Sequence, residues 1–284
     1  MKLRNDSINQ VIKRTVTVTP KTSLLEARSI LLRHKISRLI VAEGEKPIGI
    51  VTEKDMVKAI YQLGGKPLEA ICVSSFMSKD LVSVNESATL YDCANMMLNN
   101  KISSVVVLKK DGTLAGMITK TDLVSVFLTQ AAEPLKISKI MTRKVFTVKP
   151  ADSLLYVESV LVNNKISRVV VERDGKPVGI ITNRDFIPAK IPLWLKQYAD
   201  PTEVEEYRLN APSTEYKSNQ LSYLITFTAS DIMTSNPVTV DVTEDVSTAT
   251  LLMVRHGISG LPVVKNSLLV GIITKTDIVK AIAT

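Results

Sequence analysis

Four segments of this chain repeat one seven-residue pattern. They are GIVTEKD at residues 49–55, GMITKTD at 116–122, GIITNRD at 179–185 and GIITKTD at 271–277. Each segment has a glycine, two apolar residues, a threonine, two variable positions and an aspartate. Self-similarity of this kind indicates a repeat architecture, so the unit around this segment decides the fold.

A second shared element lies upstream of each copy. It consists of a lysine or glycine, an isoleucine, a serine and a β-branched run, and it covers residues 34–41, 100–107, 164–171 and 256–264. Further upstream, each copy has another short β-branched run and then apolar residues at three- and four-residue spacing behind a polar capping residue. One unit therefore reads strand, helix, strand, strand, helix in about 60 residues, which is small for an independent core, so we expect the units to pair.

Length and composition set the broad class. At 284 residues, with 45% hydrophobic and 23% charged residues, the chain has the balance of globular domains rather than of a disordered protein. It has no apolar run long enough to span a membrane and no secretory signal, so we expect a cytoplasmic protein without membrane association. The two cysteines are too few for a disulfide framework, and the net charge of +8 suits anionic partners without choosing among them.

The four copies of the pattern, each with its upstream element, resemble the CBS domain family. The resemblance covers nearly the whole chain and implies an α/β (α+β) fold of tandem CBS repeats that pack in pairs as two Bateman modules. Among family members, stand-alone archaeal or bacterial CBS proteins are the most similar, with the gamma subunit of AMP-activated kinase more distant.

The resemblance also predicts where the repeats begin and end. Module 1 combines repeat 1 and repeat 2, module 2 combines repeat 3 and repeat 4, and an aromatic-rich insertion interrupts module 2. The predicted boundaries are, in chain order, 1–66, 67–132, 133–189, 190–226 for the insertion, and 227–284.

Family members hold AMP, ADP, ATP or S-adenosylmethionine in clefts between paired repeats. The resemblance therefore implies a non-catalytic regulatory sensor that binds an adenine nucleotide, AMP, ADP or ATP, with S-adenosylmethionine as a further candidate. No catalytic or metal-binding motif is present in the sequence, so we expect neither an enzyme nor a catalytic cofactor.

The threonine and aspartate of each seven-residue segment are the first candidate site residues. A carboxylate can accept two hydrogen bonds from the vicinal hydroxyls of a ribose, and a hydroxyl at a helix start lies among free N–H groups that favour a phosphate. The same spacing is also a helix capping box, and the two roles are compatible. The pairs are Thr52 and Asp55, Thr119 and Asp122, Thr182 and Asp185, and Thr274 and Asp277.

The odd and even repeats differ in their basic residues. Repeats 1 and 3 have an arginine after the serine, Arg38 and Arg168, and a basic residue before the aspartate, Lys54 and Arg184. Repeats 2 and 4 have serine or glycine after the serine and read K-T-D. Guanidinium groups bind phosphate through paired hydrogen bonds, so we expect these basic pairs to direct phosphates into the odd clefts, although surface solvation is the alternative.

Isoleucines of the upstream element are candidates for the apolar walls around an adenine ring. Simple core packing would explain the same residues. They are Ile36, Ile102, Ile166 and Ile258.

The repeat period breaks once. From Asp55 to Met77 is 22 residues and from Asp122 to Met141 is 19, but from Asp185 to Met233 is 48. The insertion holds the single tryptophan, Trp194, and four of the seven tyrosines. It is either a tolerated surface loop or a segment that covers module 2 or docks on another chain, and we expect the second.

Two other classes of function compete with the nucleotide sensor. One is a nucleic-acid-binding protein that uses the basic surface, which no known binding motif supports, and the other is a structural assembly subunit with empty clefts. For a sensor without an attached enzyme, we expect a separate protein partner and a homodimer.

Overall fold

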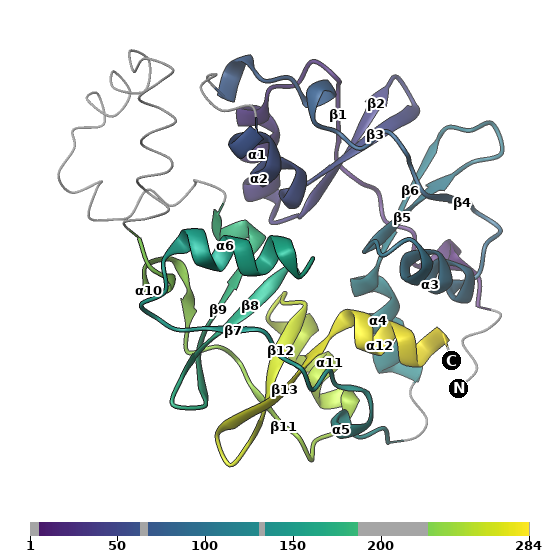
Figure 1. Ribbon diagram of the computed structural model, residues 1–284. Helices are drawn as coiled ribbons and strands as arrows, with labels where there is room; N and C mark the ends of the chain where they lie inside the picture. The colour runs from purple at the N-terminus through teal and green to yellow at the C-terminus, as the bar shows by residue number, and fades with distance from the viewer. Residues whose placement is uncertain (1–5, 63–67, 131–133, 187–226, 284) are drawn as a thin grey trace.

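The computed structural model describes residues 6–62, 68–130, 134–186 and 227–283. Within them the chain forms three three-stranded sheets and one four-stranded sheet, all flanked by helices (Figure 1). This arrangement confirms the predicted mixed α/β fold of four repeats. The insertion at 190–226 lies outside the described residues.

All four repeats contain the same elements in the same order. In repeat 1 they are β1 (Thr17–Val18), α1 (Leu24–His34), β2 (Arg38–Glu43), β3 (Lys46–Thr52) and α2 (Glu53–Gln62). In repeat 2 they are β4 (Ser83–Asn85), α3 (Leu90–Asn99), β5 (Ser104–Leu108), β6 (Leu114–Thr119) and α4 (Lys120–Gln130). In repeat 3 they are β7 (Thr147–Val148), α6 (Leu154–Asn163), β8 (Arg168–Arg173), β9 (Lys176–Thr182) and the helical turn η4 (Asn183–Phe186). In repeat 4 they are β11 (Val240–Asp241), α11 (Val246–Arg255), β12 (Gly260–Lys265), β13 (Leu268–Thr274) and α12 (Lys275–Ala283).

The first helix of each repeat ends at a residue in a left-handed conformation. The positive φ angles are 53° at Lys35, 54° at Lys101, 54° at Lys165 and 64° at Gly257. The following isoleucine amide then bonds back to the helix, as Ile36 N does to the Leu31 carbonyl at 3.0 Å. This left-handed cap turns the chain from helix to strand and places the serine of the upstream element at the start of the second strand.

Each repeat is preceded by a lead-in segment, and every lead-in crosses to the partner repeat. We define the lead-ins as residues 6–13, 68–78, 134–142 and 227–235. They contain the short elements η1 (Ile8–Gln10), η2 (Leu68–Ala70), η3 (Val73–Ser75), α5 (Ile137–Ile140), α10 (Ala229–Ile232) and β10 (Thr234–Ser235).

The crossing is made by backbone hydrogen bonds at both ends of a lead-in. In module 1, the lead-in of repeat 2 accepts a bond from Leu24 N at the start of α1 and pairs Ser78 with Ile50 of β3 at 2.9 Å in both directions. In the reverse sense, the lead-in of repeat 1 pairs Lys13 with Met117 of β6. The exchange is therefore reciprocal, and each repeat completes the core of the other.

Module 2 shows the same exchange. Thr142 of the lead-in of repeat 3 pairs with Ile272 of repeat 4, and Thr234 of the lead-in of repeat 4 pairs with Ile180 of repeat 3. Repeat 1 is thus paired with repeat 2 and repeat 3 with repeat 4, as the odd and even sequence differences predict.

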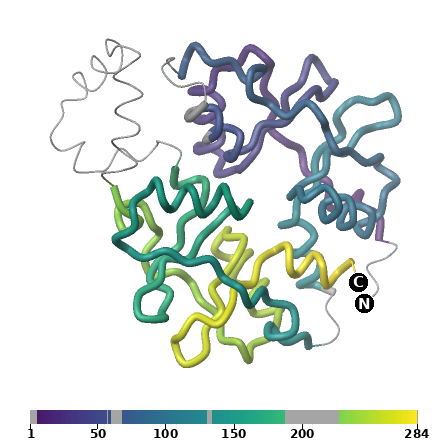
Figure 2. Tube along the Cα trace, viewed as in Figure 1, coloured from purple at the N-terminus to yellow at the C-terminus, as the bar shows by residue number. Residues whose placement is uncertain are grey.

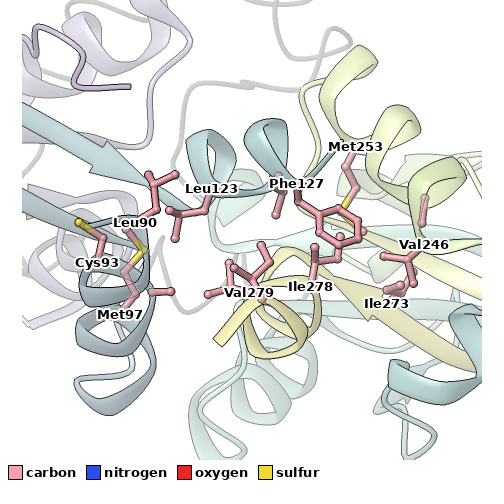
Figure 3. Close-up of a cluster of buried hydrophobic side chains, with 14 of the residues drawn as sticks. Leu90, Cys93, Met97, Leu123, Phe127, Val246, Met253, Ile273, Ile278 and Val279 are labelled. Carbon is pink, nitrogen blue, oxygen red and sulfur yellow. The ribbon is translucent and has the colours of Figure 1, made fainter. Parts of the chain in front are cut away.

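The two modules meet through the helices of repeats 2 and 4. The first and second helices of both repeats contribute to one continuous hydrophobic core, which holds Met97 of α3, Phe127 of α4, Met253 of α11 and Val279 of α12 (Figure 3). Repeats 1 and 3 have separate cores and meet at α2 and η4. The four repeats consequently lie around a common centre, each beside two others (Figure 2).

The glycine of the seven-residue segment has a role that sequence reasoning left open. At each of the four positions an added Cβ would collide with the lead-in of the partner repeat. At Gly116 it would lie 2.6 Å from Ile12 Cγ2 and 2.6 Å from the Lys13 carbonyl oxygen. At Gly49 it would lie 2.7 Å from Met77 Sδ. Only glycine lets the lead-in approach the strand this closely.

We predict that Gly116→Ala lowers the free energy of unfolding by about 1–3 kcal/mol, the range for overpacking a tight contact. The clash involves a backbone carbonyl that is itself bonded to Met117 N at 3.0 Å, so neither side can move cheaply. Urea denaturation of wild type and variant measures this change. Lys110→Ala is the control, because Lys110 is exposed in the turn between β5 and β6. Equal midpoints for Gly116→Ala and wild type would contradict the packing role.

Candidate functional site

In every repeat, the threonine and aspartate of the seven-residue segment are hydrogen-bonded to each other. One carboxylate oxygen, Oδ2, accepts from both the threonine amide and the threonine hydroxyl. In repeat 1 these two distances are 2.9 and 2.6 Å, and in repeat 4 they are 2.8 and 2.6 Å. The capping role is therefore present in all four copies, and it leaves the other oxygen, Oδ1, to bind something else.

The second oxygen is used differently in the even repeats. Oδ1 of Asp122 lies 2.5 Å from the Lys13 ammonium, and Oδ1 of Asp277 accepts a bond of 3.2 Å from the Thr142 hydroxyl. Lys13 and Thr142 both belong to the lead-in that crosses from the paired odd repeat. Both aspartates are buried, with exposed fractions of 3% and 6%.

The aspartates of the odd repeats lie closer to the surface. Asp55 and Asp185 are half-buried. Among the described residues, their Oδ1 atoms have no recorded hydrogen-bond donor. Within the described residues, a lead-in side chain therefore engages Oδ1 in repeats 2 and 4 but not in repeats 1 and 3.

Arg38 and Arg168 turn toward the even repeat of their own module. Arg168 donates to the Ser259 hydroxyl of repeat 4 at 3.1 Å and lies against Gly260, where an added Cβ would approach its Nη1 to 2.5 Å. Arg38 donates to its neighbour Ser37 at 3.0 Å. The small residue that replaces arginine in repeat 4 thus makes room for the arginine of repeat 3.

Burial lowers the pKa of both guanidinium groups. For Arg168 the pKa falls to about 10, with Asp277 acting in the opposite direction. For Arg38, Glu53 and Asp122 oppose the effect of burial. Each arginine is therefore electrostatically coupled to the aspartate of the even repeat.

Two lysines that sequence reasoning did not select complete the centre. Lys120 Nζ donates to the Thr276 hydroxyl at 3.0 Å, and Lys275 Nζ donates to the Thr121 hydroxyl at 2.9 Å. These reciprocal bonds join module 1 to module 2. The signal was visible as the K-T-D shared by repeats 2 and 4, but it gained meaning only when the two repeats came together.

Both lysines have their pKa lowered to about 8, first by burial and then by neighbouring cations. Lys120 faces Arg38, Lys280 and Arg168, with Asp277 as the opposing anion. Lys275 faces Arg168, Arg38 and Lys13, with Asp122 as the opposing anion. One cation from each repeat therefore contributes to a central basic cluster, which we define as Arg38, Lys120, Arg168 and Lys275.

In each odd repeat, the two members of the predicted basic pair lie in different places. Arg184 forms an ion pair with Glu53 of repeat 1 and a 3.4 Å bond to the Ile36 carbonyl, so it links repeat 3 to repeat 1. Burial raises the pKa of Glu53, and Arg184 opposes this rise. Lys54 is exposed. The structure thus groups Arg38 and Arg168 with the even-repeat lysines, while Arg184 lies at the contact between the odd repeats.

The four candidate isoleucines are half-buried. Each packs against a hydrophobic core: Ile36 on that of repeat 1, Ile166 on that of repeat 3, and Ile102 and Ile258 on the shared core of repeats 2 and 4. Core packing therefore accounts for part of their surface, and a role as an adenine wall remains a prediction for the rest.

Two surface hollows lie between the paired repeats, one in each module. The hollow in module 1, of about 530 Å³, is lined by Asn9, Ile12, Arg14, Glu86 and Ala115. The hollow in module 2, of about 230 Å³, is lined by Arg143, Val145, Thr147, Glu172, Gly175, Leu269 and Val270. Neither is lined by the threonine or aspartate of the seven-residue segments.

The part of the chain that the structure describes contains neither a membrane-spanning helix nor a cluster of metal ligands. No helix there combines the length and apolar character needed to cross a bilayer. Histidine, cysteine and acidic side chains also form no group of three that could hold a metal ion in these residues.

A model of the CBS domain matches residues 8–62, 73–129, 137–191 and 229–284. The chain belongs to the CBS domain family. It is 28% identical to protein MJ1404 of Methanocaldococcus jannaschii over an alignment of 286 positions that covers 98% of this chain and 62% of that one. It therefore spans less than two thirds of that relative.

A second protein from the same archaeon matches over nearly its whole length. This protein, MJ1225, is 25% identical over an alignment of 288 positions that covers 95% of this chain and 96% of that protein. The crystal structure of MJ1225, described as a candidate archaeal homologue of g-AMPK, superposes with a TM-score of 0.83 over 98% of this chain and 100% of that one, at 23% identity. This likeness shows that the two proteins share the fold of four CBS repeats.

We predict that Asp185→Ala lowers the free energy of unfolding by about 1 kcal/mol, because it removes the acceptor for Thr182 at the start of η4. Asp185→Asn keeps an acceptor oxygen, so it should cost less. Thermal denaturation of the two variants without ligand checks this order. Equal stability of wild type and Asp185→Ala would show that the cap contributes nothing.

Proposed function

We propose that this CBS protein is a regulatory sensor that binds an adenine nucleotide, AMP, ADP or ATP, with its phosphates on the central basic cluster. The main support is that one cation from each repeat lies at the junction of the two modules. These cations are Arg38, Lys120, Arg168 and Lys275. Cations withdrawn from water repel one another unless anions accompany them.

The charges around the cluster favour an anionic ligand. With Lys280 included and the Lys13–Asp122 ion pair set aside, five cations face two carboxylates, those of Glu53 and Asp277. A phosphate with multiple negative charges would offset this imbalance, and its oxygens match the donors of guanidinium and ammonium groups. The threonine hydroxyls that now accept from Lys120 and Lys275 are neutral partners that a phosphate could replace.

The remainder of the ligand would lie toward the aspartates. A ribose diol can donate to Oδ1 of Asp55 or Asp185, because Oδ2 alone is engaged in capping. The half-buried isoleucines supply apolar surface for a base. Adenine, rather than another base, is proposed from membership of the CBS family, and S-adenosylmethionine is the cationic alternative for the same clefts.

Such a ligand would act by binding and not by chemistry. Phosphates on the cluster would touch residues of both modules, so occupancy would change the contact between repeats 2 and 4. The signal would then pass to a separate partner protein or to self-association of this chain. The nucleic-acid alternative fits the cluster less well, since its cations gather at a junction of repeats instead of along an exposed face.

We expect AMP, ADP or ATP to bind with a Kd in the micromolar range or tighter in titration calorimetry, and adenosine to bind more weakly. The double variant Arg38→Ala and Arg168→Ala should lose about 1.5–3 kcal/mol of binding free energy for the phosphorylated ligand, the scale for hydrogen bonds to charged groups. It should lose little for adenosine.

Lys109→Ala is the control for that titration, because Lys109 is an exposed residue of the β5–β6 turn. S-adenosylmethionine and short RNA and DNA complete the ligand panel. Absence of heat with every adenylate would overturn the proposed function. Equal losses for adenosine and ATP in the double arginine variant would overturn only the phosphate assignment.

Binding should also take up protons near pH 8. Lys120 and Lys275 each have a pKa of about 8 without ligand, so each is partly deprotonated there, and a bound phosphate would raise that pKa. Affinity should therefore be full below this range and fall as the pH rises through 8. Calorimetry at pH 8 in buffers of different ionisation enthalpy measures the proton uptake. The double variant Lys120→Arg and Lys275→Arg keeps its charge and should show none, and equal uptake in both proteins would contradict the assignment.

A further inference from the structure

The four lead-ins place one residue each beside the seven-residue segment of the partner repeat. The positions are equivalent, because each residue pairs in a β-bridge with the residue that follows the segment glycine. Lys13 pairs with Met117, Ser78 with Ile50, Thr142 with Ile272, and Thr234 with Ile180. Three of the four carry a short hydroxyl side chain. Lys13 is the exception, and it brings a positive charge to the aspartate of repeat 2.

Lys13 occupies the carboxylate of Asp122. Its ammonium lies 2.5 Å from Oδ1, while Oδ2 accepts from the amide and hydroxyl of Thr119 at 2.8 and 2.6 Å. Both oxygens of a carboxylate that is only 3% exposed are thereby engaged. In repeat 4, the hydrogen-bond donor to the equivalent Oδ1 of Asp277 within the described residues is the neutral hydroxyl of Thr142, at 3.2 Å.

The difference between ammonium and hydroxyl matters for a competing ligand. An ammonium adds a charge–charge attraction to its hydrogen bond with a carboxylate, whereas a hydroxyl does not, so a ribose hydroxyl would displace Thr142 more readily than Lys13. The side chain of Lys13 is 70% exposed, so its ammonium can leave Asp122 for water when a strong competitor arrives. The contact is therefore reversible.

We infer that Lys13 is a built-in competitor for the cleft at Asp122, so that this cleft binds nucleotide more weakly than the cleft at Asp277. This inference rests on the proposed function and specifies which clefts fill first. The sensor would then respond over two concentration ranges, because module 1 holds one restrained cleft that module 2 lacks.

The test replaces Lys13 with the residue found at its equivalent positions. For Lys13→Thr, ADP titration calorimetry should show about one more ADP bound per chain over the ADP concentrations tested. If wild type already shows a weak second binding step, the Kd of that step should fall roughly ten- to hundredfold, as expected for removing a charged competitor. The backbone bonds of residue 13 to Met117 are unaffected by the exchange, and a thermal melt verifies the fold.

Three further variants test whether the change in ADP binding comes from the charge at residue 13 and its contact with Asp122. Lys13→Arg keeps the cation and should bind ADP as wild type does, whereas Thr142→Lys should weaken binding at the cleft of Asp277. Asp122→Asn in the Lys13→Thr background should abolish the gained binding.

The outcomes separate this inference from the proposed function. If wild type binds ADP and Lys13→Thr binds it with the same stoichiometry and affinity, the competitor role is wrong and the proposed function stands. Weaker binding by Lys13→Thr would instead make Lys13 a ligand contact and would also overturn the inference. If neither protein binds AMP, ADP or ATP, both proposals fall.

Discussion

The structure depends on the exchange of lead-in segments between paired repeats. A unit of about 60 residues leaves much of its apolar surface exposed, and here the missing part of each core comes from the chain that precedes the partner repeat. Ile8 is fully buried in the core that serves repeat 2, and Val73 is fully buried in the core of repeat 1. Where the lead-in packs against the third strand of the partner repeat, the strand has no room for a Cβ. This explains why each seven-residue segment begins with glycine. The exchange also brings side chains of one repeat to the aspartate of the other, so the module and the candidate site form together.

The second constraint is the junction of repeats 2 and 4. A shared hydrophobic core holds these repeats together, and its packing carries Lys120 and Lys275 to threonines of the opposite module. The arginines of repeats 1 and 3 point to the same region from the other side. Hydrophobic association therefore holds in place a group of mutually repelling cations, whose lowered pKa values record the cost. Under the proposed function, a ligand that supplies negative charge there would stabilise both modules and the contact between them.

The four repeats differ from one another at residues that carry charge or leave space beside the candidate site. Gly260 gives space to Arg168, and Glu53 pairs with Arg184 where the odd repeats meet. Lys13 stands where two of the other lead-ins have threonine and the third has serine. Each departure changes the charge or the space beside one seven-residue segment, so under the proposed function the four clefts would differ in affinity.

The sequence by itself determined the four repeats, their order of strands and helices, their pairing and the capping of every aspartate, because these follow from local periodicity and residue types within a few positions. It also singled out Arg38 and Arg168 as the arginines that differ between odd and even repeats. Only the tertiary structure decided that they face the even repeats, that Arg184 is engaged by Glu53, and that Lys120, Lys275 and Lys13 belong to the site. Those contacts join residues up to 156 positions apart, as between Lys120 and Thr276. Their partners are set by the packing of whole repeats, which no local pattern encodes.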